Sequence, residues 1–272
     1  MVFVAVGVAG GFLGSLVGLG GGVFIVPLIV LFMGVPIHQA VAASLVAIVA
    51  SSTASTIGYL RDDYSNIRLG LTLETATTLG AVSGGLTAHA VSREALSALF
   101  GVVLALGAVY LFFRRGETEG GAAEGSDTGR WGGRYDDRHS KREVRYRVRR
   151  LPAGLAASFI AGNLSGLLGF GGGPIQIPVM TAAMGIPMKA AAATSNFMIG
   201  VTACASAVIY YAHGTIVPSL TVPLVLGVTA GAFFGSRLAP RVRGRHLTAG
   251  LAVILLLLSI QMLLAAFGVR IR

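Results

Sequence analysis

The stretch GLGGGVFIVP at residues 18–27 recurs as GFGGGPIQIP at residues 169–178, an offset of 151 positions. Each glycine in the middle of a helix costs about 1 kcal/mol relative to alanine. Two glycine triplets at matching places in apolar segments therefore predict a helix that is interrupted at Gly20–Gly22 and again at Gly171–Gly173.

The similarity extends well beyond the triplets. Without a gap, residues 11–44 are identical to residues 162–195 at 14 of 34 positions, where chance would give about three or four in a chain this rich in glycine and alanine. The shared positions include Pro27 with Pro178 and Ser44 with Ser195. An internal duplication explains this better than chance.

Composition and the placement of charge indicate a membrane protein. Of 272 residues, 54% are hydrophobic and 12% are charged, and the mean hydropathy is +0.78, whereas soluble domains carry about 25% charged residues. Apolar stretches of about 20 residues, long enough to cross a bilayer, lie between short charged clusters. The net charge of +10 falls in loops beside these stretches, so we attribute it to membrane topology and expect no nucleic-acid partner.

The predicted fold is an all-α integral membrane protein with two pseudo-symmetric repeats. Each repeat has a glycine-broken hairpin segment followed by three continuous transmembrane helices. Residues 1–113 form the first repeat, residues 151–272 form the second, and residues 114–150 form a charged, flexible cytoplasmic loop with too few apolar residues to fold alone. The distribution of basic residues over the loops favours inverted repeats. The broken segments are expected at 1–33 and 152–184, and the continuous helices at 38–59, 69–90, 95–113, 189–211, 218–236 and 247–268.

A helix break inside the bilayer frees peptide N–H groups that must find a partner. The amides that begin the next half-helix carry partial positive charge and suit an anion. Transporters with inverted repeats hold their substrate where such breaks meet, so we predict one site between the two triplets. Close helix packing is an alternative role for the glycines. A nucleotide-phosphate loop is a weaker one, because the Gly-Lys-Ser/Thr ending is missing.

The doubled pattern Gly-x-Gly-Gly-Gly-x-x-x-x-Pro, followed by Gly-(Val/Ile)-Pro and then AASL or ATSN, resembles the TauE/SafE sulfite exporter family. The resemblance covers both halves outside residues 114–150. It implies a multi-pass permease of the prokaryotic cytoplasmic membrane that moves sulfite, sulfonates or related organosulfur anions. We therefore expect a secondary transporter that exports a small anion by alternating access, with an anion substrate and membrane lipid as partners. An anion channel, or a scaffold that docks a partner through the basic central loop, are the alternatives.

Polar residues gather around the second break more than around the first. Neutral donors of this kind can replace water around an anion. The predicted substrate-binding residues are the glycines of both triplets, Gly20, Gly21, Gly22, Gly171, Gly172 and Gly173, with Ser44, Gln176, Thr194, Ser195 and Asn196. Hydrogen bonding of these side chains to helix carbonyls is an equal alternative.

Titratable groups are scarce inside the predicted spans. Glu74 is the only acidic residue well inside one, which suggests a coupling proton or cation, and a solvated helix end is the alternative. Tyr59 and Tyr210 end matched helices and are expected in the headgroup belt. No cluster with metal-ligand spacing and no Ser-His-Asp set is recognisable, so we expect no metal, no cofactor and no enzyme activity.

Overall fold

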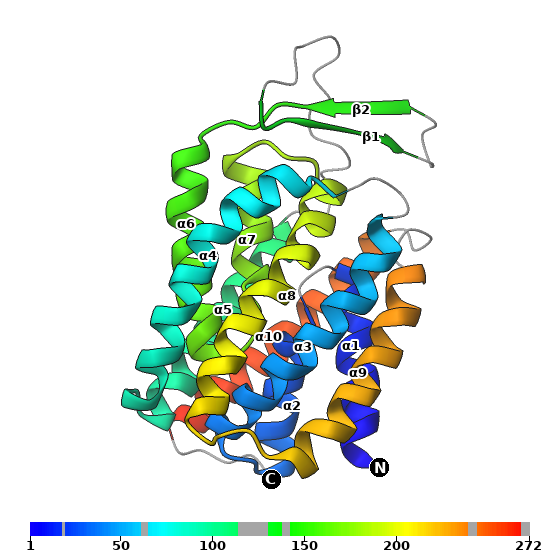
Figure 1. The fold of residues 1–272 in the computed structure, drawn as a ribbon. Helices are drawn as coiled ribbons and strands as arrows, with labels where there is room; N and C mark the ends of the chain where they lie inside the picture. Colours follow the sequence, from blue (N-terminus) through cyan, green and yellow to red (C-terminus); the bar gives the residue numbers. More distant parts are fainter. Residues whose placement is uncertain (18–19, 61–64, 114–129, 138–141, 239–243, 268–272) are drawn as a thin grey trace.

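The computed structural model describes residues 1–17, 20–60, 65–113, 130–137, 142–238 and 244–267. The prediction of an all-α membrane protein is confirmed by a bundle in which nearly every described residue is helical (Figure 1). The first half contains α1 (Val2–Val17), α2 (Gly22–Met33), α3 (Ile37–Leu60), α4 (Ile67–Thr87), the 3-10 helix η1 (Ala88–Ala90) and α5 (Arg93–Phe113). The second half contains α6 (Leu151–Leu168), α7 (Gly173–Pro178), the π-helix η2 (Val179–Ala183), α8 (Met188–Ala212), α9 (Pro218–Leu238) and α10 (Gly244–Ala266).

The outer surface of the bundle suits lipid. Five helices of the described chain are long and apolar enough to cross a membrane. Large apolar side chains on α4, α5, α9 and α10 point outward, among them Leu79, Leu106, Leu226 and Leu257. A soluble monomer rarely exposes so much contiguous apolar surface, whereas hydrocarbon tails cover it without cost. The candidate spans are Ile37–Thr56, Arg93–Tyr110, Leu151–Leu168, Met188–Ala212 and Pro218–Leu238.

Helices of the two halves interleave. α1 packs along α9, α4 packs along α6, and α5 packs along α10. Since α6 is the repeat counterpart of α1 and α9 is the counterpart of α4, the first two pairs are the same contact made twice. In Figure 1, α1 runs toward the end of the bundle that carries the β-hairpin, whereas α6 begins beside the hairpin and runs away from it.

Glycines allow two of these helix pairs to approach closely. A Cβ added to Gly231 would overlap the carbonyl oxygen of Val8 across the α1–α9 contact. A Cβ added to Gly80 would overlap the carbonyl oxygen of Phe159 across the α4–α6 contact. Gly80 and Gly231 are repeat partners, so small residues bring the backbones together in both pairs, as is common between membrane helices.

A β-hairpin lies in the connection between the halves. β1 (Gly133–Asp137) pairs antiparallel with β2 (Arg142–Tyr146), and the hairpin lies across one end of the bundle (Figure 1). Tyr135 and Tyr146 are buried in one apolar cluster with Leu69, Leu73 and Met184. The prediction of a flexible loop is therefore corrected for these strands. Their tyrosines pack on apolar surface of the bundle, which the connection alone does not provide.

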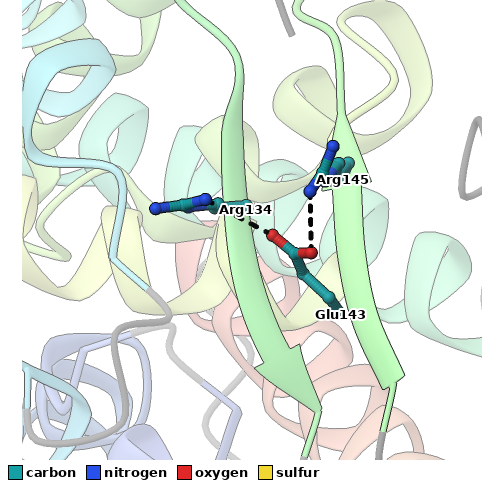
Figure 2. A network of polar contacts seen from close by, with 3 residues as sticks. All are labelled: Arg134, Glu143 and Arg145. Carbon is teal, nitrogen blue, oxygen red and sulfur yellow. Dashed lines mark hydrogen bonds and ion pairs between the residues drawn. The ribbon is translucent and has the colours of Figure 1, made fainter. Parts of the chain in front are cut away.

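Charged side chains on the outer face of the hairpin form a small network (Figure 2). Arg145 Nη2 donates to Glu143 Oε2 at 2.9 Å, and Arg134 Nη1 lies 3.7 Å from Glu143 Oε1. The hydrogen bond from Arg145 lowers the pKa of Glu143. Because all three side chains are exposed to solvent, such ion pairs add little to stability. The buried tyrosines hold the hairpin in place.

Candidate substrate site between two helix breaks

Both predicted helix breaks are present. Gly20 has φ of +72°, and Gly171 and Gly172 have φ of +83° and +85°. An L-residue in this left-handed region costs about 1–2 kcal/mol. The helix resumes at Gly22, the first residue of α2, and at Gly173, the first residue of α7. Close packing is therefore not the sole role of the triplets.

The helix begins again in the same way after each break. In α2, the amides of Phe24 and Ile25 donate to the carbonyl of Gly21 at 3.1 and 3.0 Å. The equivalent bonds in α7 run to the carbonyl of Gly172, also at 3.1 and 3.0 Å. The first amide of each helix precedes these bonds and belongs to the positive end of the helix dipole.

The two breaks lie against one another at the centre of the bundle. A Cβ added to Gly22 would lie 2.5 Å from the carbonyl oxygen of Gly169 and 3.0 Å from Cα of Phe170. A Cβ added to Gly20 would lie 3.5 Å from the Phe170 carbonyl oxygen. Ser44 Oγ, on α3, donates to the Gly169 carbonyl at 2.6 Å. The duplicated glycine runs, far apart in sequence, thus form adjoining walls.

Two isoleucines that were not predicted as site residues fill the space between the breaks. Ile199 Cγ2 lies 2.5 Å from a Cβ added to Gly171 and 3.2 Å from one added to Gly20. Ile48 Cδ1 lies 2.5 Å from a Cβ added to Gly22, and both isoleucines are fully buried. They are repeat partners, 151 positions apart. Both repeats carry isoleucine at this position, and that match is the sequence signal that could have identified the pair.

Polar side chains follow the same face of α8 as Ile199. Ser195 and Asn196 lie four and three residues before it, the spacing that places side chains on one helix face. Both are buried, and Ser195 Oγ and Asn196 Nδ2 have no hydrogen-bond partner among the described residues. Buried polar atoms in proteins nearly always have a partner, so these two unsatisfied donors call for an explanation.

The opposite wall carries one further unpartnered hydroxyl, on Ser165, and one unpartnered acceptor, Gln176 Oε1, among the described residues. Ser165 Oγ on α6 is buried without a partner within the described chain, four residues before Gly169. Gln176 Nε2 on α7 donates to Thr77 Oγ1 at 3.1 Å. The Gln176 carboxamide also lies 3.6 Å from a Cβ added to Gly172, so this side chain lies over the second break.

Two of the predicted site residues use their hydroxyl groups elsewhere. Thr194 Oγ1 accepts a hydrogen bond from the backbone N–H of Asn66 at 3.0 Å, which joins α8 to the start of α4. Ser44 has one hydroxyl proton, and carbonyl oxygens of Val41 and Gly169 lie 2.9 and 2.6 Å from its Oγ. A substrate contact by Ser44 or Thr194 stays a prediction, and the contacts present are structural.

The prediction that Tyr210 lies in the headgroup belt is wrong. Its side chain is fully buried, and its hydroxyl donates to the carbonyls of Gly166 and Leu167 at 3.2 and 3.3 Å. The phenol thereby caps the last turn of α6, just before the second break, and does not lie in a headgroup belt. The side chain of Tyr59 lies outside the described residues.

The walls of the site are neutral. No charged side chain occurs in α1, α2, α6 or α7. Within the described ranges, no group of three or more His, Cys, Asp or Glu residues could hold a metal ion. A ligand bound here would contact amides, hydroxyls and carboxamides, which are donors that suit a small anion.

Membrane-spanning helices, paired central breaks and neutral buried donors define a multi-pass membrane transporter. The sequence pattern of the family described as Sulfite exporter TauE/SafE matches residues 3–262, and the chain belongs to that family.

Relatives from bacteria and an archaeon carry names of the same class. The chain is 25% identical over 270 residues, 97% of each chain, to Probable membrane transporter protein YunE of Bacillus subtilis (strain 168). It is 26% identical over 278 residues to a Probable membrane transporter protein of Methanocaldococcus jannaschii, covering 97% of this chain and 95% of the relative. A third relative, from Xylella fastidiosa (strain 9a5c), is 26% identical over 232 residues, 85% and 81% of the two chains. None of the solved structures matches the chain.

Proposed function

We propose that this protein is a secondary transporter that exports a small oxidised-sulfur or organosulfur anion, such as sulfite, across the prokaryotic cytoplasmic membrane. The observation that carries the proposal is the contact between two left-handed glycine breaks, beside the buried and unpartnered donors of Ser195 and Asn196. The family description names sulfite export, and the relatives are named as transporters.

The chemistry of the site fits an oxyanion. The start of α2 offers backbone amides, the start of α7 offers that of Gly173, since Pro174 has no N–H, and Ser195 and Asn196 offer a hydroxyl and a carboxamide N–H. Several such donors can replace the water around three anionic oxygens. Because the walls carry no full positive charge, the anion is held without being trapped, which allows release in each transport cycle.

The side chains of Ile48 and Ile199 lie between the breaks. The proposed site is therefore closed in the described conformation, and substrate enters when the walls separate. The α1–α9 and α4–α6 pairs, each held by close backbone contact at glycines, would move as rigid bodies. The opposite directions of α1 and α6 in Figure 1 support inverted repeats, the arrangement in which rocking opens the site to alternate sides.

Flux assays with the full chain in proteoliposomes test this proposal. Sulfite, sulfate, thiosulfate, sulfoacetate and acetate would be compared as substrates in counterflow of a labelled anion. We expect saturable counterflow with at least one sulfur oxyanion or sulfonate and none with acetate. Flux that does not saturate and shows no counterflow would indicate a channel. No flux of any anion would leave only the scaffold alternative.

A pair of matched variants tests the donors. Ser195→Ala removes an unpartnered hydroxyl from the proposed site, whereas Ser206→Ala removes a buried hydroxyl on the same helix that donates to the Thr202 carbonyl at 3.3 Å. Losing one hydrogen bond to a charged ligand costs about 1.5–3 kcal/mol, so Ser195→Ala should raise the KM about tenfold or more. Equal transport by the two variants would remove Ser195 from the site.

A further inference from the structure

One buried carboxyl group lies outside the anion site. Glu74, on α4, is only 4% exposed, so the alternative of a solvated helix end is wrong. Its Oε1 accepts hydrogen bonds from Thr78 Oγ1 at 2.9 Å and from Thr202 Oγ1 at 2.8 Å. Its Oε2 is buried and has no hydrogen-bond partner in the described part of the chain.

No described residue of opposite charge compensates this carboxyl. Among the described residues Glu74 makes no ion pair. Arg68, six positions earlier on α4, is about 9 Å away along the helix and donates to the carbonyl of Arg130. Lys189 on α8 is 13 residues before Thr202, about 20 Å along that helix. α6 contributes no titratable residue. On α4 and on η1 and α8, which pack against it, the titratable residues are Glu74 itself, Arg68, His89, Lys189, Cys204, Tyr210 and Tyr211. The hairpin, which packs on Leu69 and Leu73, adds Tyr135 and Tyr146, while its Arg134, Glu143 and Arg145 side chains are exposed to solvent.

An isolated carboxylate at this place would be costly. Burial of an unpaired charge costs several kcal/mol even after the protein relaxes, and a bound proton removes that charge. A metal ion fits less well, since even Ca²⁺ takes about six to eight oxygen ligands, and the Glu74 carboxyl has two hydroxyl neighbours. The environment therefore favours a neutral, protonated carboxyl.

The repeat provides an internal comparison. The counterpart of Glu74 is Val225 on α9, and the counterpart of Thr202 is Ser51 on α3. α9 packs against α3 as α4 packs against α8. The same interface is thus built once without any carboxyl group, so helix packing does not require an acid at position 74.

The carboxyl is linked to the anion site through both of its helices. Thr77, on the same face of α4 as Glu74, accepts the hydrogen bond from Gln176 at the second break. Thr202 lies three residues beyond Ile199 on α8. α4 and α8 cannot part around Glu74 without moving groups on both walls of the site.

We propose that Glu74 binds and releases the proton that couples anion transport to the proton gradient, an inference that rests on the proposed function. The proton resides on Oε2 while α4 and α8 enclose the carboxyl, and it passes to water when the helices part. Thr78 and Thr202 are positioning residues, because their hydroxyls hold Oε1 as the accepting oxygen.

Proton movement in proteoliposomes tests this role. An entrapped pH-sensitive dye would report proton flux when a gradient of thiosulfate is imposed, since thiosulfate itself carries no proton across the bilayer near neutral pH. Wild-type protein should show a proton flux coupled to the anion flux, and Glu74→Gln should lose at least nine-tenths of that proton flux. Counterflow exchange by Glu74→Gln should lose its pH dependence, because glutamine mimics the protonated acid. Glu94→Gln, which changes an exposed glutamate at the start of α5, is the matched control and should match wild type in both assays.

A second measurement does not depend on transport. Infrared difference spectra of the purified full chain should contain the C=O band of a buried, protonated carboxylic acid at neutral pH, and Glu74→Gln should lack it. Thr202→Val should shift the pH at which the band disappears. Proton flux that persists in Glu74→Gln, transport driven by a sodium gradient alone, or absence of the band in wild type would overturn the inference. Absence of counterflow for every anion would instead refute the proposed function, and the infrared result would still decide the state of Glu74.

Discussion

Gly172→Ala separates the backbone role of the second break from ordinary packing. A Cβ at this position has room, since its nearest neighbours would be the Ala161 carbonyl oxygen and the Gln176 carboxamide at 3.6 Å. The φ of +85° nevertheless opposes any L-side chain by about 1–2 kcal/mol, offset by up to about 1 kcal/mol from the less flexible unfolded chain. Gly185 has φ of +72° in a turn with nothing within 4 Å of an added Cβ. Gly185→Ala should therefore destabilise the fold by a similar amount, about 1 kcal/mol.

The two variants should differ in transport. In Gly172→Ala, relief of the strained φ shifts the Gly173 amide at the start of α7. Losing one hydrogen bond to a charged ligand costs about 1.5–3 kcal/mol, or about 10- to 100-fold in affinity. Denaturant unfolding in detergent and concentration-dependent counterflow would measure the two effects separately. If Gly172→Ala and Gly185→Ala lose stability equally and transport equally well, the break does not bind the anion.

Three further predictions concern stability and pH. Gly84→Ala places a Cβ over the Asn163 carbonyl oxygen in the α4–α6 contact and should cost about 1–3 kcal/mol of unfolding free energy. Gly250→Ala, on α10 with open space around it, should be neutral or stabilising. A larger loss of stability in Gly250→Ala than in Gly84→Ala would contradict the close α4–α6 contact. Tyr210→Phe removes the hydroxyl that caps α6 and should cost about 1 kcal/mol in the same unfolding assay, while an unchanged value would show that the cap is dispensable. Burial, then the charges of His213 and His38, lower the pKa of His89, whose ring stacks on His213 at 4.1 Å. The unfolded chain then binds the proton more readily, so stability falls as pH drops below about 6.5. Between neutral and mildly acidic pH, the Tm of His89→Gln should fall less than the Tm of wild type. An equal fall in Tm would assign the pH dependence to other groups.

The helical architecture and the breaks could be predicted because local sequence determines them. Long apolar runs require helices in a bilayer, and the positive φ values at Gly20, Gly171 and Gly172 favour glycine. The repeat register also predicts that the two triplets lie together, because duplicated halves bury equivalent segments against each other. Ile48 and Ile199 were missed because apolar residues in an apolar helix carry no distinguishing signal except that register.

The hairpin and the environments of Tyr210 and Glu74 depend on contacts between distant segments. The strands β1 and β2 look polar in sequence, and they pack on the bundle through Tyr135 and Tyr146. Tyr210 ends a helix, yet α6 passes close enough to accept its hydroxyl. Glu74 lies near a helix end, yet α8 covers it through Thr202. The distance of a residue from the end of its own helix does not show which neighbouring helix covers its side chain.

Selenite, the selenium analogue of sulfite, allows the site to be located directly. Anomalous diffraction from crystals of the full chain grown with selenite would show where the anion binds. We predict one strong peak between the starts of α2 and α7, within hydrogen-bond distance of Ser195 and Asn196. A peak only at the arginines of the hairpin, or none between the two breaks, would contradict the account.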